Sequence, residues 1–125
     1  MSAKKILVIE DNPDVRENIE EILELSGYDV RTANNGVEGV KAAKEATPDL
    51  VICDIMMPGM DGYGVLYALS KDENLSTTPF IFLTAKVEME DRRKGMRMGA
   101  DDYLTKHFDE SDLLMTVENR IAKNE

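Results

Sequence analysis

Short apolar runs recur along the chain and are separated by longer amphipathic stretches. Such runs are typical of strands, and runs without polar alternation indicate strands that are covered on both faces. The run at 28–33 is more polar than the others, so we expect it at an edge of the sheet. The predicted strands are residues 6–9, 28–33, 50–53, 80–84 and 103–105.

The stretches between these runs carry apolar residues at helical spacing. Asn12 can cap a helix whose first residue is Pro13, and Gly27 can end that helix with a positive φ. Asp109 can cap the last helix in the same way. The other predicted helices are residues 36–46, 63–71 and 87–98.

For two of these helices the sequence also predicts which residues face inward or how stable the helix is. In 36–46 the spacing predicts that Val37, Val40 and Ala43 face inward. The helix at 87–98 is mostly charged and has little apolar surface to bury. Because packing of an apolar face supplies most helix stability in proteins, we expect 87–98 to be the loosest helix.

Strands and helices alternate without any linker, repeat or low-complexity segment. This order favours a doubly wound α/β fold around a five-stranded parallel sheet, with helices on both faces. A chain of 125 residues is long enough for one hydrophobic core. We therefore predict a single domain over residues 1–125.

Polar side chains follow the apolar runs at the points where the strands end. Glu10 and Asp11 follow the first run, Asp54 follows the third, Thr84 ends the fourth and Lys106 follows the fifth. The carboxyl ends of parallel strands meet at one edge of a sheet, where open α/β folds place their sites. The pattern therefore predicts a functional site built from these five residues.

Three carboxylates at one edge repel one another unless a cation lies between them. A hard divalent ion such as Mg²⁺ or Mn²⁺ suits oxygen ligands of this kind, and Lys106 and Thr84 suit the oxygens of a phosphoryl group. A carboxylate can also act as the nucleophile and form an aspartyl-phosphate. The spacing does not choose which carboxylate is attacked.

The overall charge narrows the range of partners. Against 15 basic residues the chain has 25 acidic ones, which gives a formal net charge of −10. This charge argues against direct binding of nucleic acid and fits a divalent cation or a partner with a basic face. A lone cysteine and the lack of a long apolar run predict a cytoplasmic protein that does not enter the membrane.

Four motifs together closely resemble the receiver domain of two-component response regulators. They are Glu10-Asp11, Asp54 with the segment 57–62, Thr84-Ala85, and the segment 99–106. The resemblance covers essentially the whole chain with every motif in order. It implies a sheet of order 2-1-3-4-5.

The resemblance also implies a function and a set of ligands. Asp54 would accept a phosphoryl group from a histidine kinase or phosphotransfer protein. Asp11, Asp54 and the backbone carbonyl of Met56 would bind Mg²⁺, and Glu10 would reach the ion through water.

The remaining site residues would transmit the signal. Lys106 and Thr84 would hold the phosphoryl oxygens, and a shift of Thr84 would let Tyr103 rotate inward. This would repack the surface of the last two helices and the last strand for a downstream protein, or for an effector domain outside this chain. The resemblance implies a monomer or a weak phosphorylation-dependent dimer, and a signalling domain that catalyses only its own phosphorylation and dephosphorylation.

The sequence departs from the family pattern after the lysine, where His107 replaces the usual proline. A cis bond before a residue other than proline costs roughly 3–4 kcal/mol, so we predict a trans Lys106–His107 bond. A trans bond would weaken phosphorylation or switching. The alternative function is therefore a degenerate receiver that binds partners without phosphorylation.

The positions beside the site are also distinctive. Met56 and Lys86 are both long enough to shield an acyl phosphate from water, so we predict slow self-dephosphorylation. A flavin carrier of similar fold would need a phosphate-cradling loop after the first strand, where this chain has acids. A phosphatase with an aspartyl nucleophile would usually need a larger cap and a second acid beside the nucleophile.

Overall fold

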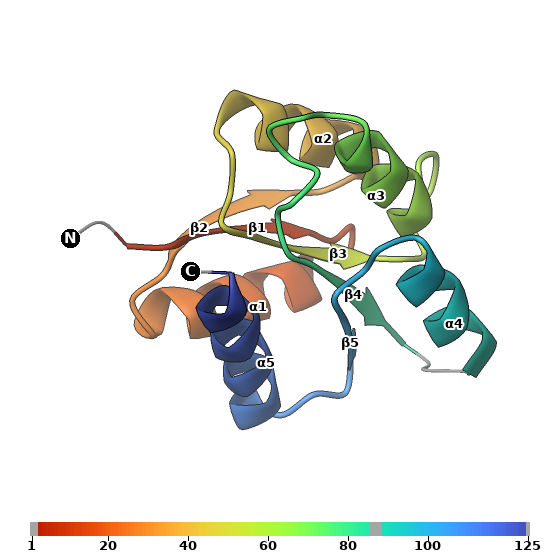
Figure 1. The fold of residues 1–125 in the computed structure, drawn as a ribbon. Helices are drawn as coiled ribbons and strands as arrows, with labels where there is room; N and C mark the ends of the chain where they lie inside the picture. The colour runs from red at the N-terminus through yellow and green to blue at the C-terminus, as the bar shows by residue number, and fades with distance from the viewer. Residues whose placement is uncertain (1–2, 86–88, 125) are drawn as a thin grey trace.

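The computed structural model describes residues 3–85 and 89–124. Strands and helices alternate along the chain, as Figure 1 shows, and this confirms the predicted order. The strands are β1 (Lys5–Ile9), β2 (Asp29–Ala33), β3 (Leu50–Asp54), β4 (Phe80–Thr84) and β5 (Asp102–Thr105). The helices are α1 (Pro13–Leu25), α2 (Gly36–Glu45), α3 (Gly62–Ser70), α4 (Met89–Arg97) and α5 (Glu110–Lys123).

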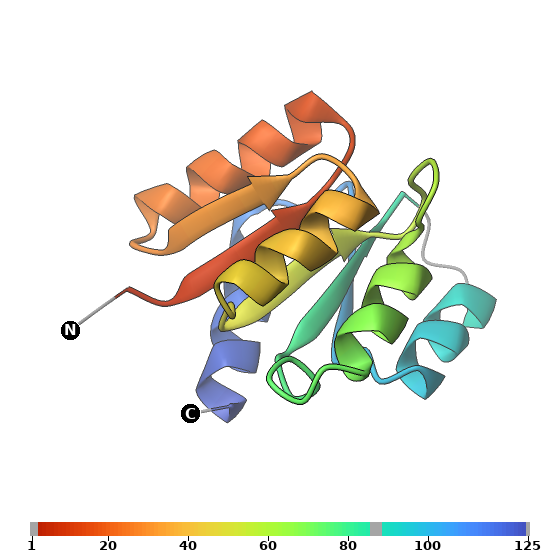
Figure 2. The ribbon, with the colours of Figure 1, turned by 90° about the horizontal axis from the view of Figure 1, so that it is seen from above.

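The five strands form one parallel sheet of order β2-β1-β3-β4-β5, and the predicted topology is confirmed. The more polar strand β2 lies at an edge of the sheet, as its composition indicated. All five residues of the central strand β3 are buried. In Figure 2 the strands run toward the same side of the molecule, so the residues that follow them are brought to one edge.

Helices cover both faces of the sheet. In Figure 1, α2 and α3 lie on one side and α1 and α5 on the other. Successive residues of a strand point to opposite faces. Val51 and Cys53 accordingly join the cluster under α2 and α3, whereas Leu50 and Ile52 join the cluster over α1 and α5.

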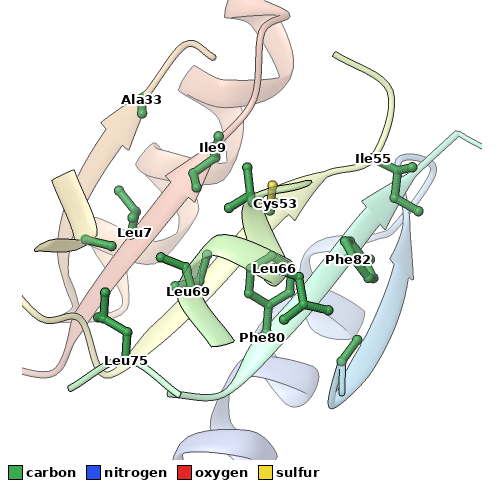
Figure 3. Close-up of a cluster of buried hydrophobic side chains, with 14 of the residues drawn as sticks. Leu7, Ile9, Ala33, Cys53, Ile55, Leu66, Leu69, Leu75, Phe80 and Phe82 are labelled. Atoms are coloured by element: carbon green, nitrogen blue, oxygen red, sulfur yellow. The ribbon is translucent and has the colours of Figure 1, made fainter. Parts of the chain in front are cut away.

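The core under α3 is closely packed. Figure 3 shows Leu66 and Leu69 of α3 close to Phe80 of β4, with Cys53 of β3 in the same cluster. The rings of Phe80 and Phe82 meet edge to face with centroids 5.0 Å apart. Burial raises the pKa of the Cys53 thiol well above its ordinary value, so this cysteine is an inert core residue.

The predicted helix caps at Asn12 and Asp109 are confirmed, and the observed bounds of α2 and α3 differ from the predicted ones by one residue. The Asn12 side chain accepts hydrogen bonds from the backbone N–H groups of Asp14 and Val15 at 2.9 and 3.3 Å. Asp109 caps α5 by accepting from the Asp112 backbone N–H at 2.8 Å. The predicted start of α4 at Val87 lies outside the described residues.

The inward position predicted for Val37 is wrong, because this side chain is 60% exposed. Helix α2 instead turns its smallest residues inward. A Cβ atom at Gly36 would lie 2.7 Å from the Met60 carbonyl oxygen, and one at Gly39 would lie 2.8 Å from Cγ1 of Ile9. Close approach of the helix at these glycines rotates the neighbouring valine toward solvent.

Candidate functional site

Three acidic side chains converge beyond the ends of β1 and β3. Glu10 follows β1 and is fully buried, Asp11 is exposed, and Asp54 ends β3 with 1% exposure. One carboxylate oxygen from each lies within 4.8 Å of the others. The structure therefore brings the three predicted acids together at the carboxyl edge of the sheet.

Lys106 bridges two of these acids. Its ammonium donates hydrogen bonds to Oε1 of Glu10 at 2.8 Å and to Oδ2 of Asp54 at 3.1 Å. Its backbone N–H donates to the Thr84 carbonyl at 2.7 Å, which extends the contact between β4 and β5 past the end of β5. Burial lowers the pKa of Lys106, but the two carboxylates outweigh burial and the pKa is raised. The ion pair with Glu10 was not predicted from the sequence.

The environment of Asp54 disfavours its charged form. Burial is the main cause that raises the pKa of this carboxyl, Glu10 adds to the rise and Lys106 opposes it, and together they bring the pKa to about 7. Oε2 of Glu10 is buried and has no hydrogen-bond partner among the described residues. An oxygen left unpaired beside other carboxylates fits a site that takes a hydrated divalent cation.

Thr84 and Tyr103 lie on the neighbouring strands β4 and β5, next to the acidic site. Thr84 ends β4 and is 6% exposed, and Tyr103 in β5 is 7% exposed. The ring centroids of Tyr103 and Phe82 are 5.5 Å apart. The tyrosine that the resemblance expects to rotate inward on switching is therefore already inward in this structure.

The loop after β3 is tightly closed beside Asp54. The Gly62 backbone N–H donates to the Ile55 carbonyl at 2.8 Å, and a Cβ atom at Gly62 would lie 2.8 Å from the Ile55 Cα atom. A residue without a side chain is required at such a close approach. Met56, at the start of this loop, extends into solvent with 79% of its surface exposed.

Two further predicted positions have different outcomes. His107 is exposed, and its bond to Lys106 is trans as predicted, since no described peptide bond is cis. The side chain of Lys106 nevertheless reaches Asp54. Lys86, predicted to shield the site together with Met56, lies outside the described residues.

Arg16 touches the site but was missed in the sequence. This half-buried residue in the first turns of α1 donates from Nη1 to the Glu10 carbonyl at 2.9 Å, and its contact with the Asp11 carbonyl is longer, at 3.5 Å. The sequence offered only the weak signal of an arginine early in a helix after the acidic pair. Its contact depends on how α1 leaves the sheet, which the sequence pattern does not specify.

The assembled groups are of the kinds that phosphoryl transfer uses. The structure pairs a carboxylate oxygen of Asp54 with the Lys106 ammonium at 3.1 Å, and in general a carboxylate can serve as the nucleophile and an ammonium can offset developing negative charge. The acidic loop after β1 would repel the phosphate of a flavin.

Among the residues that the structure describes, none of the helices combines the length and the apolar character needed to cross a bilayer.

Comparisons with known proteins agree with this description. A family model described as the response regulator receiver domain matches residues 6–118. The DNA-binding dual master transcriptional regulator RpaA of Synechocystis is 40% identical over 113 residues, which is 90% of this chain and 47% of RpaA. Protein PilH of Pseudomonas aeruginosa is 40% identical over 118 residues, which is 94% of this chain and 98% of PilH. The chain spans about half the length of the transcriptional regulators it matches.

A solved structure extends the likeness to the whole fold. The receiver domain of the sensor histidine kinase PA1611 from Pseudomonas aeruginosa superposes with a TM-score of 0.89 and is 31% identical, covering 97% of this chain and 99% of that one. That receiver holds a magnesium ion coordinated in its active site cleft. On its motifs, its sheet order and the match over residues 6–118, this chain belongs to the response regulator receiver domain family.

Proposed function

We propose that this receiver accepts a phosphoryl group on Asp54 from a phosphohistidine of a histidine kinase or phosphotransfer protein. The observation that carries the proposal is the buried Asp54 carboxylate, which lies 3.1 Å from the Lys106 ammonium and beside two further acids. An oxygen of Asp54 attacks phosphorus, the bond between phosphorus and the imidazole nitrogen breaks, and that nitrogen keeps the electron pair. The product is an acyl phosphate on Asp54.

Asp11, Asp54 and the backbone carbonyl of Met56 are proposed to hold Mg²⁺ or Mn²⁺, with Glu10 contacting it through water. The three carboxylate oxygens within 4.8 Å and the unpaired Oε2 of Glu10 support this ligand set. When bound, the ion supplies positive charge that offsets the acids and the phosphoryl oxygens. The magnesium in the PA1611 receiver supports the same assignment.

Lys106 and Thr84 are proposed to bind the oxygens of the phosphoryl group. Lys106 already reaches Oδ2 of Asp54 although its bond to His107 is trans, which favours a competent receiver over a degenerate one. Because its ammonium also pairs with Glu10, a change in that pairing accompanies the arrival of the phosphoryl group. Thr84 ends β4 beside this lysine and supplies a hydroxyl donor.

The proposed output is a shift between two packings of α4, β5 and α5 that starts at Thr84 and Tyr103. Tyr103 is inward in this structure, so phosphorylation is expected to favour this position rather than to create it. The partners are a cytoplasmic phosphodonor and a downstream protein or an attached effector domain. Residues 1–125 are proposed to act as one receiver domain, monomeric or weakly dimeric when phosphorylated.

The test is incubation with acetyl phosphate and Mg²⁺, followed by intact-protein mass spectrometry. The wild type is expected to gain one phosphoryl group, and the gain is expected to vanish in Asp54→Asn and in the presence of a chelator. Modification that persists in Asp54→Asn would refute the assignment of the acceptor. A wild type that is folded but never modified, by acetyl phosphate or by a phosphohistidine donor, would favour the phosphorylation-independent binding module.

A further inference from the structure

The backbone leaves the sheet at Glu10. The Glu10 backbone N–H makes a bond to the Ala33 carbonyl, at 3.0 Å, one residue beyond the end of β1. The carbonyls of Glu10 and Asp11 follow this point and lie outside the strand. Backbone carbonyls without a strand partner need another donor or water.

The Arg16 guanidinium supplies that donor from the other end of the loop. It bonds to the Glu10 carbonyl at 2.9 Å, and the Arg16 backbone N–H bonds to the Asn12 carbonyl at 3.0 Å. Asn12 in turn caps α1 with its side chain. The backbone bond to Asn12 is the first hydrogen bond of the helix itself, so it is the side chain of Arg16 that ties the carbonyl of Glu10 to the first turns of α1.

We infer that Arg16 is a positioning residue for the acidic pair, a role that rests on the metal binding proposed above. Holding the Glu10 carbonyl restricts rotation of the peptide between Glu10 and Asp11, and this rotation sets where both carboxylates lie. Glu10 is fully buried, and its Oε1 accepts from Lys106 at 2.8 Å and from the Asn12 backbone N–H at 3.4 Å, so a small change in the loop alters the placement of the unpaired Oε2. Arg16 thus keeps the carboxylates close enough to share one cation.

A purely electrostatic role for Arg16 predicts the opposite result from a positioning role. A positive charge near a cation site repels the cation, so removing the charge would strengthen Mg²⁺ binding. Loss of positioning would weaken it. The sign of the change in Mg²⁺ affinity therefore separates the two explanations.

The experiment is calorimetric titration of Mg²⁺ into the metal-free full chain, for wild type, Arg16→Met and Arg16→Lys. Arg16→Met keeps most of the alkyl stem and is expected to weaken Mg²⁺ binding roughly tenfold, as loss of groups that orient metal ligands typically does. Arg16→Lys keeps one donor group and the charge, and is expected to recover part of the affinity. Arg31→Met is the matched control, since it removes an equal charge whose partner is Glu45 rather than the acidic loop.

Circular dichroism of each variant establishes that it is folded, and amide exchange at Asp11 and Asn12 in the metal-free state gives a second measurement. Exchange at these two amides is expected to accelerate in Arg16→Met and to stay unchanged in Arg31→Met. An unchanged or tighter Mg²⁺ affinity in a folded Arg16→Met, with a wild type that binds Mg²⁺, would overturn the inference alone. A wild type that binds no Mg²⁺ would overturn the proposed metal site, and the role of Arg16 with it.

Discussion

The buried carboxylate of Asp54 makes stability depend on pH at the scale of a single residue. Its pKa is raised from 3.8 to about 7, so the folded chain holds a proton that the unfolded chain has lost between these values. The contribution of this group to stability is therefore full below about pH 4 and is lost as the pH rises toward 7. In the absence of metal, Asp54→Asn is expected to be more stable than wild type at pH 8, by up to about 4 kcal/mol, with the difference shrinking toward pH 4.

Urea unfolding at pH 5 and pH 8 with a chelator measures this difference. Asp29→Asn removes an exposed carboxylate from β2 and controls for the general effect of lowering the negative charge. Asp54→Asn that is no more stable than Asp29→Asn at pH 8 would contradict the burial argument.

Met56 is expected to slow the loss of the phosphoryl group. Its side chain begins two residues after Asp54 and extends into solvent, where it can lie over an acyl phosphate and hinder approaching water. Met56→Ala is expected to speed dephosphorylation several-fold, measured as decay of the phosphorylated mass after the phosphodonor is removed. Met115→Ala, which shortens an exposed methionine on α5, is the control. Equal decay in both variants and wild type would show that Met56 gives no protection.

Single residues also show why part of the site was predictable. Asp54 and Lys106 were found because each follows an apolar run, and parallel strands bring such positions to one edge. The pairing of Lys106 with Glu10 was not found, because it depends on which of several acids a flexible side chain reaches. Arg16 was missed for a related reason, since its contact is set by the direction of α1.

At the scale of an element, the packing of helix α4 against β5 relies on the close approach of Gly95 to the ring of Tyr103. Among residues 93–97 it is the only buried position, and a Cβ atom there would lie 2.8 Å from Cε2 of Tyr103. Replacing glycine by alanine inside a helix usually stabilises it by about 1 kcal/mol. Gly95→Ala is expected to lack this gain in wild type, because the new methyl group collides with the inward ring, and to show it in a Tyr103→Ala background.

A double-mutant cycle by urea unfolding measures this coupling, since contacting residues are non-additive. The same gain from Gly95→Ala in both backgrounds would show that Tyr103 does not rest on Gly95 in solution. Acrylamide quenching of tyrosine fluorescence in a chain whose other tyrosines are phenylalanine reports whether Gly95→Ala moves the ring outward.

Elements were predicted well where a continuous apolar run alone decides them. The strands β3 and β4 are of this kind, and all five residues of each are buried in the structure. Val37 was placed wrongly because apolar character was taken to decide the inward face of α2. Gly36 and Gly39 let the helix approach Met60 and Ile9, which turns Val37 outward. Val40 and Ala43 pack against the core as predicted.

At the scale of the whole molecule, a net charge of −10 acts in two ways. Dispersed acids repel one another weakly, and any salt screens them. The cluster at the carboxyl edge, with oxygens within 4.8 Å, is different because a divalent ion can contact several of its members at once. The stabilisation caused by screening and that caused by specific binding can therefore be told apart by comparing sodium and magnesium salts at equal ionic strength.

Thermal unfolding in NaCl and in MgCl₂ of equal ionic strength tests this separation. NaCl is expected to stabilise wild type and Asp11→Asn alike, because screening does not require the cluster. Mg²⁺ at a hundred times its dissociation constant adds about 2.7 kcal/mol to a chain that binds it only when folded, which raises Tm by on the order of 10 °C at this length. Asp11→Asn removes one proposed ligand and is expected to lose most of that extra rise. If Mg²⁺ and matched NaCl shifted Tm equally in both chains, the acids would act only as dispersed charge, and the carboxyl edge would hold no specific cation.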